Sequence, residues 1–197
     1  MGLMLANRLV LATAIVIGGA SCATVAAAQN YTIDTAHSVL KLRVFKSGLL
    51  SPFAHNHEIE AAIAEGTVHL SSDPGVDLKV RARELRVIDP GVSPKDRGQT
   101  QATMEGPEVL DVKRFPEISF QSTSVQKKGE RHWTVRGNLT LHGQTSAIDL
   151  EVADKDGHYQ GSALLRQRDF GMTPVSIAGG TVRVKDEVKV EFDIVLK

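Results

Sequence analysis

Two histidines separated by a single residue form the most distinctive local pattern in the chain. His55 and His57 begin a segment, residues 55–61, whose composition is typical of a β-strand. Because residues i and i+2 of a strand point to the same face, both imidazoles can reach one metal ion or one ligand head group. A zinc site needs three or four ligands, and His37 and His69 are candidates for a third. The pattern therefore predicts either a site for Zn²⁺ or another divalent metal, or two polar groups at the rim of a binding cavity.

Two cationic residues offer a second kind of binding chemistry. Arg97 and Lys95 lie in a polar segment, residues 94–112, and their side chains can donate charge-assisted hydrogen bonds to a phosphate. Ordinary surface charge is the commoner explanation for such residues. We take His55, His57 and Arg97 as candidate head-group or rim residues.

Catalytic chemistry finds little support in the sequence. The only cysteine is Cys22, and no Gly-x-Ser-x-Gly nucleophile motif is present. Basic and acidic side chains both number 23, so the formal net charge is zero and the basic excess typical of nucleic-acid binding is missing. We therefore expect a binding protein that needs no cofactor, has no catalytic residues and has no nucleic-acid partner.

The elements that position these residues follow a period of two, which is the period of β-strands. In residues 133–152, apolar side chains alternate with polar ones on both sides of His142-Gly143. A two-residue turn at His142-Gly143 would pair Val135 with Leu150 and would place the apolar residues of both strands on one face. Turn length and apolar alternation agree, so this segment is predicted to be a β-hairpin.

The C-terminal segment shows the same alternation. Val182 and Val184 precede a charged triplet, residues 185–187, and Val188 and Val190 follow on alternate positions. A three-residue loop would keep the apolar residues of both arms on one face. We therefore predict a second hairpin here.

Shorter alternating stretches at residues 40–44, 66–70, 78–83, 118–120 and 159–166 complete the set of strand candidates. Many short strands with few helices are typical of a β-sandwich or a β-barrel. Residues 94–112 lack the alternation, and Pro94 and Pro107 suit the first turns of two short helices. A further helical turn is predicted at residues 48–53.

The N-terminal segment has the character of an export signal. Residues 1–28 contain Arg8, a short apolar run and the sequence Ala26-Ala27-Ala28, which fits signal-peptidase cleavage. The apolar run is shorter than the roughly 20 residues that a membrane-spanning helix needs. We expect a periplasmic or secreted domain at residues 29–197 without a stable transmembrane segment after cleavage; lipidation at Cys22 is an alternative.

Motifs spread along the chain resemble those of the YceI-like family of periplasmic lipid-binding proteins. They include Arg114-Phe115-Pro116 and the Leu139-Thr-Leu141-His-Gly143 turn region, and they occur in the family's order. The matching segments are residues 31–38, 104–122, 135–145 and 168–172. The sequence departs from the family at residues 54–58, where the paired histidines stand in place of a segment rich in glycine and phenylalanine.

The resemblance implies an all-β fold, an eight-stranded antiparallel lipocalin-like barrel with short capping helices, and an interior that takes a polyisoprenoid or similar amphiphile. An eight-stranded barrel encloses either packed side chains or one small ligand. Alternation assigns an inward face to apolar residues that are therefore candidates for the ligand lining, or simply core. These residues are Leu40, Leu42, Leu78, Val80, Ile118, Phe120, Val135, Leu139 and Phe170.

Three functions remain in view at this point. The first is a binding protein that holds an isoprenoid or fatty amphiphile in the barrel interior. The second is a metal-binding protein or metalloenzyme that uses His55 and His57. The third is a stress-related interaction protein with a solid barrel. The strand pattern leaves a homodimer open in each case.

Overall fold

The structure is a computed structural model that describes residues 29–48, 56–71, 73–177, 179 and 181–197. The expected signal peptide at residues 1–28, His55, and most of the helical turn predicted at residues 48–53 lie outside these residues. The described part is built mainly from β-strands, as the period of two predicts.

Twelve strands, one α-helix (α1, Pro94–Glu105) and two 3-10 helices (η2, Ala82–Glu84; η3, Gln167–Phe170) make up the described fold. The strands are β1 (Gln29–Thr32), β2 (Val39–Ser47), β3 (His57–Ala61), β4 (Ile63–Leu70), β5 (Gly75–Arg81), β6 (Arg86–Val87), β7 (Glu117–Gly129), β8 (His132–Leu141), β9 (Gln144–Lys155), β10 (His158–Arg166), β11 (Ser176–Ile177) and β12 (Val182–Val195).

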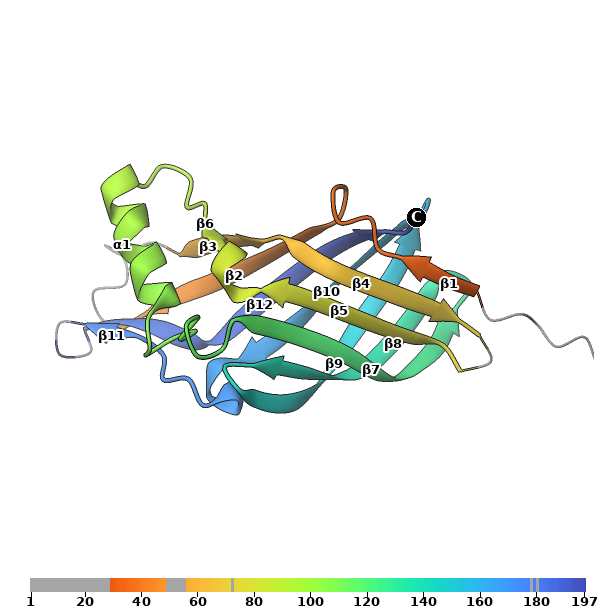
Figure 1. Cartoon of the computed structure of the whole chain (residues 1–197). Helices are drawn as coiled ribbons and strands as arrows, with labels where there is room; N and C mark the ends of the chain where they lie inside the picture. Colours follow the sequence, from red (N-terminus) through yellow and green to blue (C-terminus); the bar gives the residue numbers. More distant parts are fainter. Residues whose placement is uncertain (1–28, 49–55, 72, 178, 180) are drawn as a thin grey trace, which may run out of the picture.

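The strands form one sheet that curls into a half-barrel (Figure 1). Its hydrogen-bonded order is β1-β4-β5-β7-β8-β9-β10-β12-β2-β3-β6, and β11 pairs with β12. The curl follows from the chain itself, because only Ala62 separates β3, near one end of this order, from β4, near the other. The Ile33–Leu196 bridge also ties the residue after β1 to the end of β12.

The expected number of eight strands is wrong. Eleven strands lie along the hydrogen-bonded order of the described sheet. The difference has two sources: Ala62 divides one extended run into β3 and β4, and the short strands β1 and β6 pair at the two ends of this order. Alternation over four or more residues cannot reveal two-residue strands, so their existence depends on tertiary pairing.

The hairpin predicted at residues 133–152 is confirmed in its register. Val135 lies opposite Leu150, and Gly137 lies opposite Ile148. His142 and Gly143 both have positive φ, 52° and 72°, which is the backbone of the two-residue turn that matches the twist of paired strands. A Cβ atom on Gly143 would lie 2.4 Å from Cε1 of Phe115, so the turn also needs glycine for close packing.

The hairpin predicted at the C-terminus is wrong, because β12 is continuous from Val182 to Val195. It pairs with β10 on one side and with β2 on the other, and its register with β2 shifts between Val184 and Val188. The backbone N–H of Arg168, in η3, donates to Asp186 within this bulge (3.0 Å). A bulge of this length keeps the apolar alternation in phase just as a three-residue loop would, so the sequence pattern could not separate the two.

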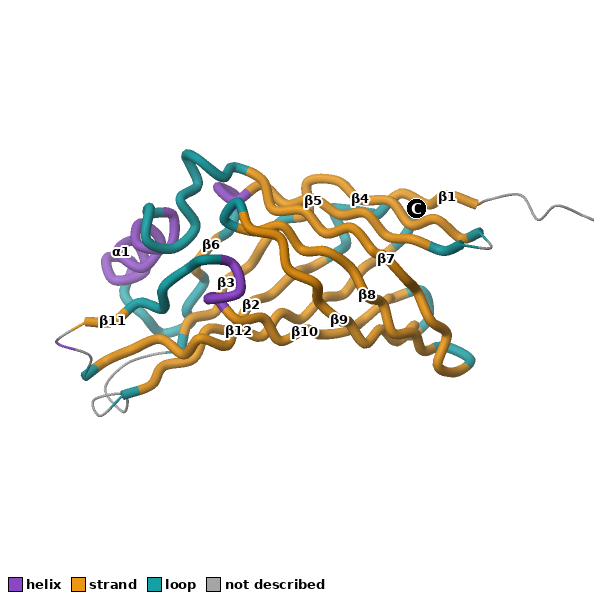
Figure 2. Tube along the Cα trace, turned by 90° about the horizontal axis from the view of Figure 1, so that it is seen from below, coloured by secondary structure: helices purple, strands orange, loops and turns teal. Residues whose placement is uncertain are grey.

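One of the two helices predicted in residues 94–112 is present. Ser93 caps α1 by accepting a hydrogen bond from the backbone N–H of Asp96, and Pro94 begins the helix. Residues 107–110 form turns and not a second helix. The helix lies at one end of the strands, beside β6, and β1 lies at the other end (Figures 1 and 2).

The apolar core occupies the inside of the curl in two clusters. The larger cluster is centred on buried side chains such as Phe120, Leu139 and Phe170. The smaller one joins Ile33, Ile63 and Ile194 where β1, β4 and β12 meet. Burial of each such side chain stabilises the fold by roughly 1.5–3 kcal/mol relative to its exposed state, so these clusters hold the half-barrel together.

Candidate functional site

The residues predicted to line the barrel interior all belong to the larger apolar cluster or pack against it. Val80, Phe120, Val135, Leu139 and Phe170 are buried within it. The others are only partly buried: Leu40, Leu42, Leu78 and Ile118. The structure therefore brings the predicted lining together on the inner face, although five of its members are fully engaged in packing.

Further apolar side chains on the inner face were missed as lining residues. Ile148, Leu150 and Val152 of β9 point inward on alternate positions, yet each remains partly exposed. Val190 of β12 behaves in the same way. The alternation that predicted the hairpin also marks these residues as inward-facing, but no local pattern shows that their neighbours leave them incompletely covered.

One row of inward residues crosses the sheet in register. Trp133 pairs with Val152, Val152 with Gly161, Gly161 with Phe192, and Phe192 with Leu40. All five residues are partly exposed. This row therefore keeps part of its apolar surface accessible.

Two glycines shape the inner face by admitting aromatic rings. A Cβ atom on Gly161 would lie 2.5 Å from Cζ of Phe192, and one on Gly137 would lie 2.4 Å from Cζ of Phe120. Each ring therefore lies directly against the backbone of a neighbouring strand. This packing keeps both phenylalanines close to the wall and away from the middle of the half-barrel.

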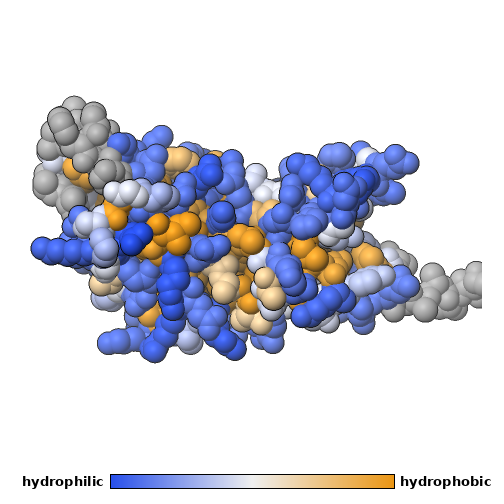
Figure 3. Space-filling model, turned by 90° about the horizontal axis from the view of Figure 1, so that it is seen from above, coloured by the Kyte–Doolittle hydropathy of each residue, from blue (hydrophilic) through white to orange (hydrophobic). Residues whose placement is uncertain are grey.

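Apolar surface is also visible from outside the molecule. In the space-filling view from above, hydrophobic side chains run along the middle of the face between hydrophilic margins (Figure 3).

No helix among the described residues has the length and apolar character required to cross a membrane.

His57 lies at the start of β3 and is held by a buried carboxylate. Its Nδ1 is 2.6 Å from Oδ2 of Asp89, and Oδ1 of Asp89 accepts a hydrogen bond from the backbone N–H of Glu58 (2.6 Å). Asp89 is only 1% exposed. This contact orients the imidazole and leaves Nε2 as its second polar atom. Asp89 was not a sequence candidate, because its neighbours in the chain give no sign of its burial.

The other candidate metal ligands are not brought to His57. His37 contacts Asp34 (2.9 Å), and His69 contacts Asn30 (2.9 Å). His69 lies twelve positions after His57 along a mostly extended chain, which corresponds to roughly 40 Å at about 3.3 Å per residue. Among the described residues no group of three or more His, Cys, Asp or Glu side chains could hold a metal ion. The predicted His55–His57 pair stays a prediction, since His55 lies outside the described residues.

Arg97 lies on α1 and lines a hollow of about 580 Å³ between the helix and β6. His57 is not part of this hollow. The two predicted rim residues within the described chain therefore occupy different places.

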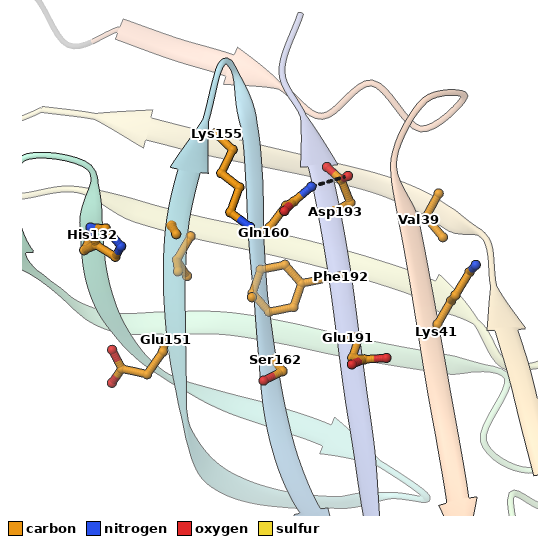
Figure 4. Close-up of a pocket in the computed structure, with 13 residues that line it drawn as sticks. Val39, Lys41, His132, Glu151, Lys155, Gln160, Ser162, Glu191, Phe192 and Asp193 are labelled. Atoms are coloured by element: carbon orange, nitrogen blue, oxygen red, sulfur yellow. Dashed lines mark hydrogen bonds between the residues drawn. The ribbon is translucent and has the colours of Figure 1, made fainter. Parts of the chain in front are cut away.

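A second hollow, of about 630 Å³, is lined by residues of β2, β9, β10 and β12 together with His132 of β8 (Figure 4). It contains both charge signs, including Lys41, Glu191 and Asp193, and Gln160 Nε2 donates to Asp193 (2.8 Å). The Lys189 ammonium donates to Glu191 and lowers the pKa of that carboxyl, with a further contribution from Arg43. None of the nine predicted lining residues borders this hollow, although Val152, Gly161 and Phe192 of the row across the sheet do.

An antiparallel half-barrel with an apolar inner face defines the class of the protein, and sequence comparison gives its family. The pattern of the YceI-like domain matches residues 31–196, so the chain belongs to the YceI-like family.

Relatives agree with this assignment. A UPF0312 protein of Pectobacterium carotovorum is 24% identical over 180 residues, which cover 86% of this chain and 88% of that protein. A UPF0312 protein of Pseudomonas syringae pv. tomato is 38% identical over 73 residues, but this match spans only 32% of the chain and 38% of that protein.

Solved structures show the same fold. BcnA of Burkholderia cenocepacia aligns over 84% of this chain and 99% of its own, with a TM-score of 0.62 at 16% identity. A polyisoprenoid-binding domain from Saccharophagus degradans, implicated in plant cell wall breakdown, aligns over 85% of this chain and 97% of its own, with a TM-score of 0.55 at 14% identity. Identities this low establish likeness of fold alone.

Proposed function

We propose that the chain is a binding protein that holds one polyisoprenoid or other long-chain amphiphile inside the half-barrel. The observation that carries the proposal is the set of inward apolar side chains on β2, β9 and β12 that remain partly exposed, because they offer apolar surface that a chain of methyl and methylene groups would cover. The fold shared with a polyisoprenoid-binding domain supports this ligand class.

The driving force for such a ligand is ample. Burial of one methylene group contributes about 0.8 kcal/mol, so each five-carbon prenyl unit contributes on the order of 3–4 kcal/mol before the cost of ordering the chain. A few units therefore approach the practical limit of non-covalent affinity. The depth of the interior, more than the strength of attraction, would set the length of chain that is held.

We further propose that the protein acts after export, in the periplasm or outside the cell. The signal-like composition of residues 1–28 supports export, and lipidation at Cys22 is the alternative fate of that segment. Holding a ligand requires no catalytic group, so we assign no catalytic residue. The expected ligand is an amphiphile with one long apolar tail.

The proposal is tested by mass spectrometry of organic extracts from protein purified without detergent. A co-purifying prenyl or fatty amphiphile, present at a level comparable with the protein, is the expected result. Empty extracts together with no uptake of added prenyl lipids would leave the half-barrel as a solid scaffold, which is the interaction protein considered from the sequence.

A metal-binding role is a second candidate, and the His57–Asp89 contact favours it. A metal-bound histidine commonly donates its other ring nitrogen to a carboxylate, and Asp89 is placed to accept from Nδ1 of His57. Calorimetric titration with Zn²⁺ tests this role. A heat that the His55→Ala/His57→Ala variant loses would support a site; identical heats from the variant and the wild type would exclude it.

A further inference from the structure

The wall of the half-barrel contains a stretch in which β9 and β10 are not paired with each other. The ladder between them starts at their connecting turn and ends at the pair Glu151–Ser162, both labelled in Figure 4. Residues 144–150 of β9 and residues 163–166 of β10 lie beyond that pair. On their other sides β9 stays paired with β8, and β10 stays paired with β12. We call this unpaired stretch of the wall the β9–β10 seam.

The seam is bounded at both ends. The ladder between the two strands closes one end. At the other end β10 leads into η3, which lies against β9, β10 and β12. Nδ1 of His142, in the β8–β9 turn, lies 3.2 Å from the carbonyl oxygen of Phe170 at the end of η3. The seam is therefore an enclosed part of the wall and not a free margin of the sheet.

Apolar side chains border the seam on both faces of the wall. Ile148 and Leu150 of β9 point to the inside and are partly exposed. On β10, Ala163 and Leu165 also point inward and are buried. Leu164 points outward and is 60% exposed, which makes it one of two exposed large hydrophobic residues in the described chain. An apolar molecule that crosses the wall here would meet apolar surface outside and inside.

Separating β9 from β10 along the seam breaks no ladder between them. The opposite edge of β9 differs, because its ladder with β8 continues from the turn at Gln144 to Ala153. Each net backbone hydrogen bond that must break lowers the population of an opened form by roughly five-fold. Local opening is easiest where few such bonds resist it. Among the two edges of β9, the seam is therefore the one that opens more readily.

We infer that the β9–β10 seam is the route by which a long-chain amphiphile enters and leaves the half-barrel. The inference rests on the proposed function, because it gives a path to the ligand that is held inside. A lateral path suits a long flexible chain, since the chain passes sideways through the wall and is not threaded along its full length. Groups that only line a path change the rates of uptake and release together, whereas groups that hold the bound ligand change its affinity.

A reversible crosslink across the seam tests this route. Asp149→Cys/Leu164→Cys, made in a chain that also carries Cys22→Ser, places two thiols where the register of the ladder would continue. The matched control, Glu151→Cys/Ser162→Cys, places thiols on the same strands where the ladder already joins them. Ethanediyl bismethanethiosulfonate links the thiols, and dithiothreitol releases them. Mass spectrometry checks the crosslink, and thermal unfolding checks that each linked protein is folded.

Farnesol is the probe, with uptake followed by Trp133 fluorescence and release followed by transfer to phosphatidylcholine vesicles. We expect the seam crosslink to slow uptake and release by at least about 10-fold and to change the dissociation constant by less than about 3-fold, because it blocks the path and not the bound position. Dithiothreitol should restore both rates. The control crosslink should leave both rates within about 2-fold of those of its reduced form.

A single substitution tests the same route without a crosslink. Leu164→Asp puts a carboxylate on the outer side of the seam, and passage of an apolar chain past it would strip water from the charge. We expect uptake and release to slow together by about 3- to 10-fold with little change in affinity. Ser162→Asp is the control, because Ser162 is exposed on the same face of β10 but lies within the ladder; its rates should match the wild type.

Unchanged rates in the linked seam variant and in Leu164→Asp would overturn the route through the seam while leaving the proposed function intact. A weaker affinity with an unchanged rate of uptake would overturn the route as well, because the seam would then hold the ligand and not admit it. Equal slowing by the seam crosslink and by the control crosslink would also contradict it. Absence of farnesol binding by the wild type would overturn the proposed function itself.

Discussion

The two strands of the β8–β9 hairpin look alike in sequence but play different parts in the structure. On β8, Val135 and Leu139 are buried in the apolar cluster. On β9, Ile148 and Leu150 point to the same inner face and stay partly exposed. The two paired strands of one hairpin therefore differ, because the inward residues of β8 are buried in the core whereas those of β9 keep accessible apolar surface. Inward alternation identifies a face, whereas the use of that face depends on what lies across from it.

Matched truncations on the two strands should give the largest difference. Leu139→Ala should lower the free energy of unfolding by about 3–4 kcal/mol, because it empties a packed site. Leu150→Ala should cost about 1–2 kcal/mol, since part of its surface is exposed already. Urea unfolding measures both values, provided that the dependence of the unfolding free energy on urea concentration has the same slope in each variant. Equal losses would remove the distinction between a packed strand and an open one.

Glycine replacement tests the packed strand from the opposite direction. Gly137→Ala would place a Cβ atom 2.4 Å from Cζ of Phe120 and 2.6 Å from the carbonyl oxygen of Gln121. We expect a loss of about 1–3 kcal/mol from overpacking. Gly129→Ala is the control, because its nearest neighbour is a His132 side-chain atom at 3.9 Å. An unchanged free energy of unfolding in Gly137→Ala would show that β8 and β7 are not tightly packed at this position.

Filling the open strand should affect ligand binding more than stability. Ile148→Phe adds bulk on the inner face, and we expect less than about 1.5 kcal/mol of destabilisation but at least a several-fold loss of prenol affinity. Ala147→Phe adds the same ring at the adjacent exposed position and should bind like the wild type. Isothermal titration with a prenol distinguishes the two variants; identical affinities would place the ligand elsewhere.

The outer face of the curl should contribute least. Because the hydrogen bond from Lys189, with help from Arg43, lowers the pKa of Glu191 in the folded state, its stabilisation is present above the unfolded pKa of roughly 4.3 and is lost as pH falls through the lower folded value. Glu191→Gln should therefore slightly reduce the fall in stability between neutral pH and about pH 3. Urea midpoints across that range provide the measurement; an unchanged or steeper fall would contradict the sign.

The sequence predicts the hairpin at residues 133–152 down to its register, because the turn residues and the alternation constrain each other. It fails at β12, where the alternation has the same phase across a bulge as across a loop. The hollow between α1 and β6 could not be predicted from the sequence. Three residues that line it, Arg83, Arg97 and Lys113, come together only through the docking of α1. The burial of Asp89 beside His57 likewise depends on contacts between segments far apart in the chain.

A fluorescence titration tests the central claim most directly. Trp133 is the only tryptophan, lies in register with Val152 on the inner face and is partly exposed. Addition of a long-chain prenol should shift its emission to shorter wavelength and saturate at about one ligand per chain. An emission spectrum that does not change with excess prenol, in protein shown to be folded and stripped of lipid, would contradict a ligand in the half-barrel interior.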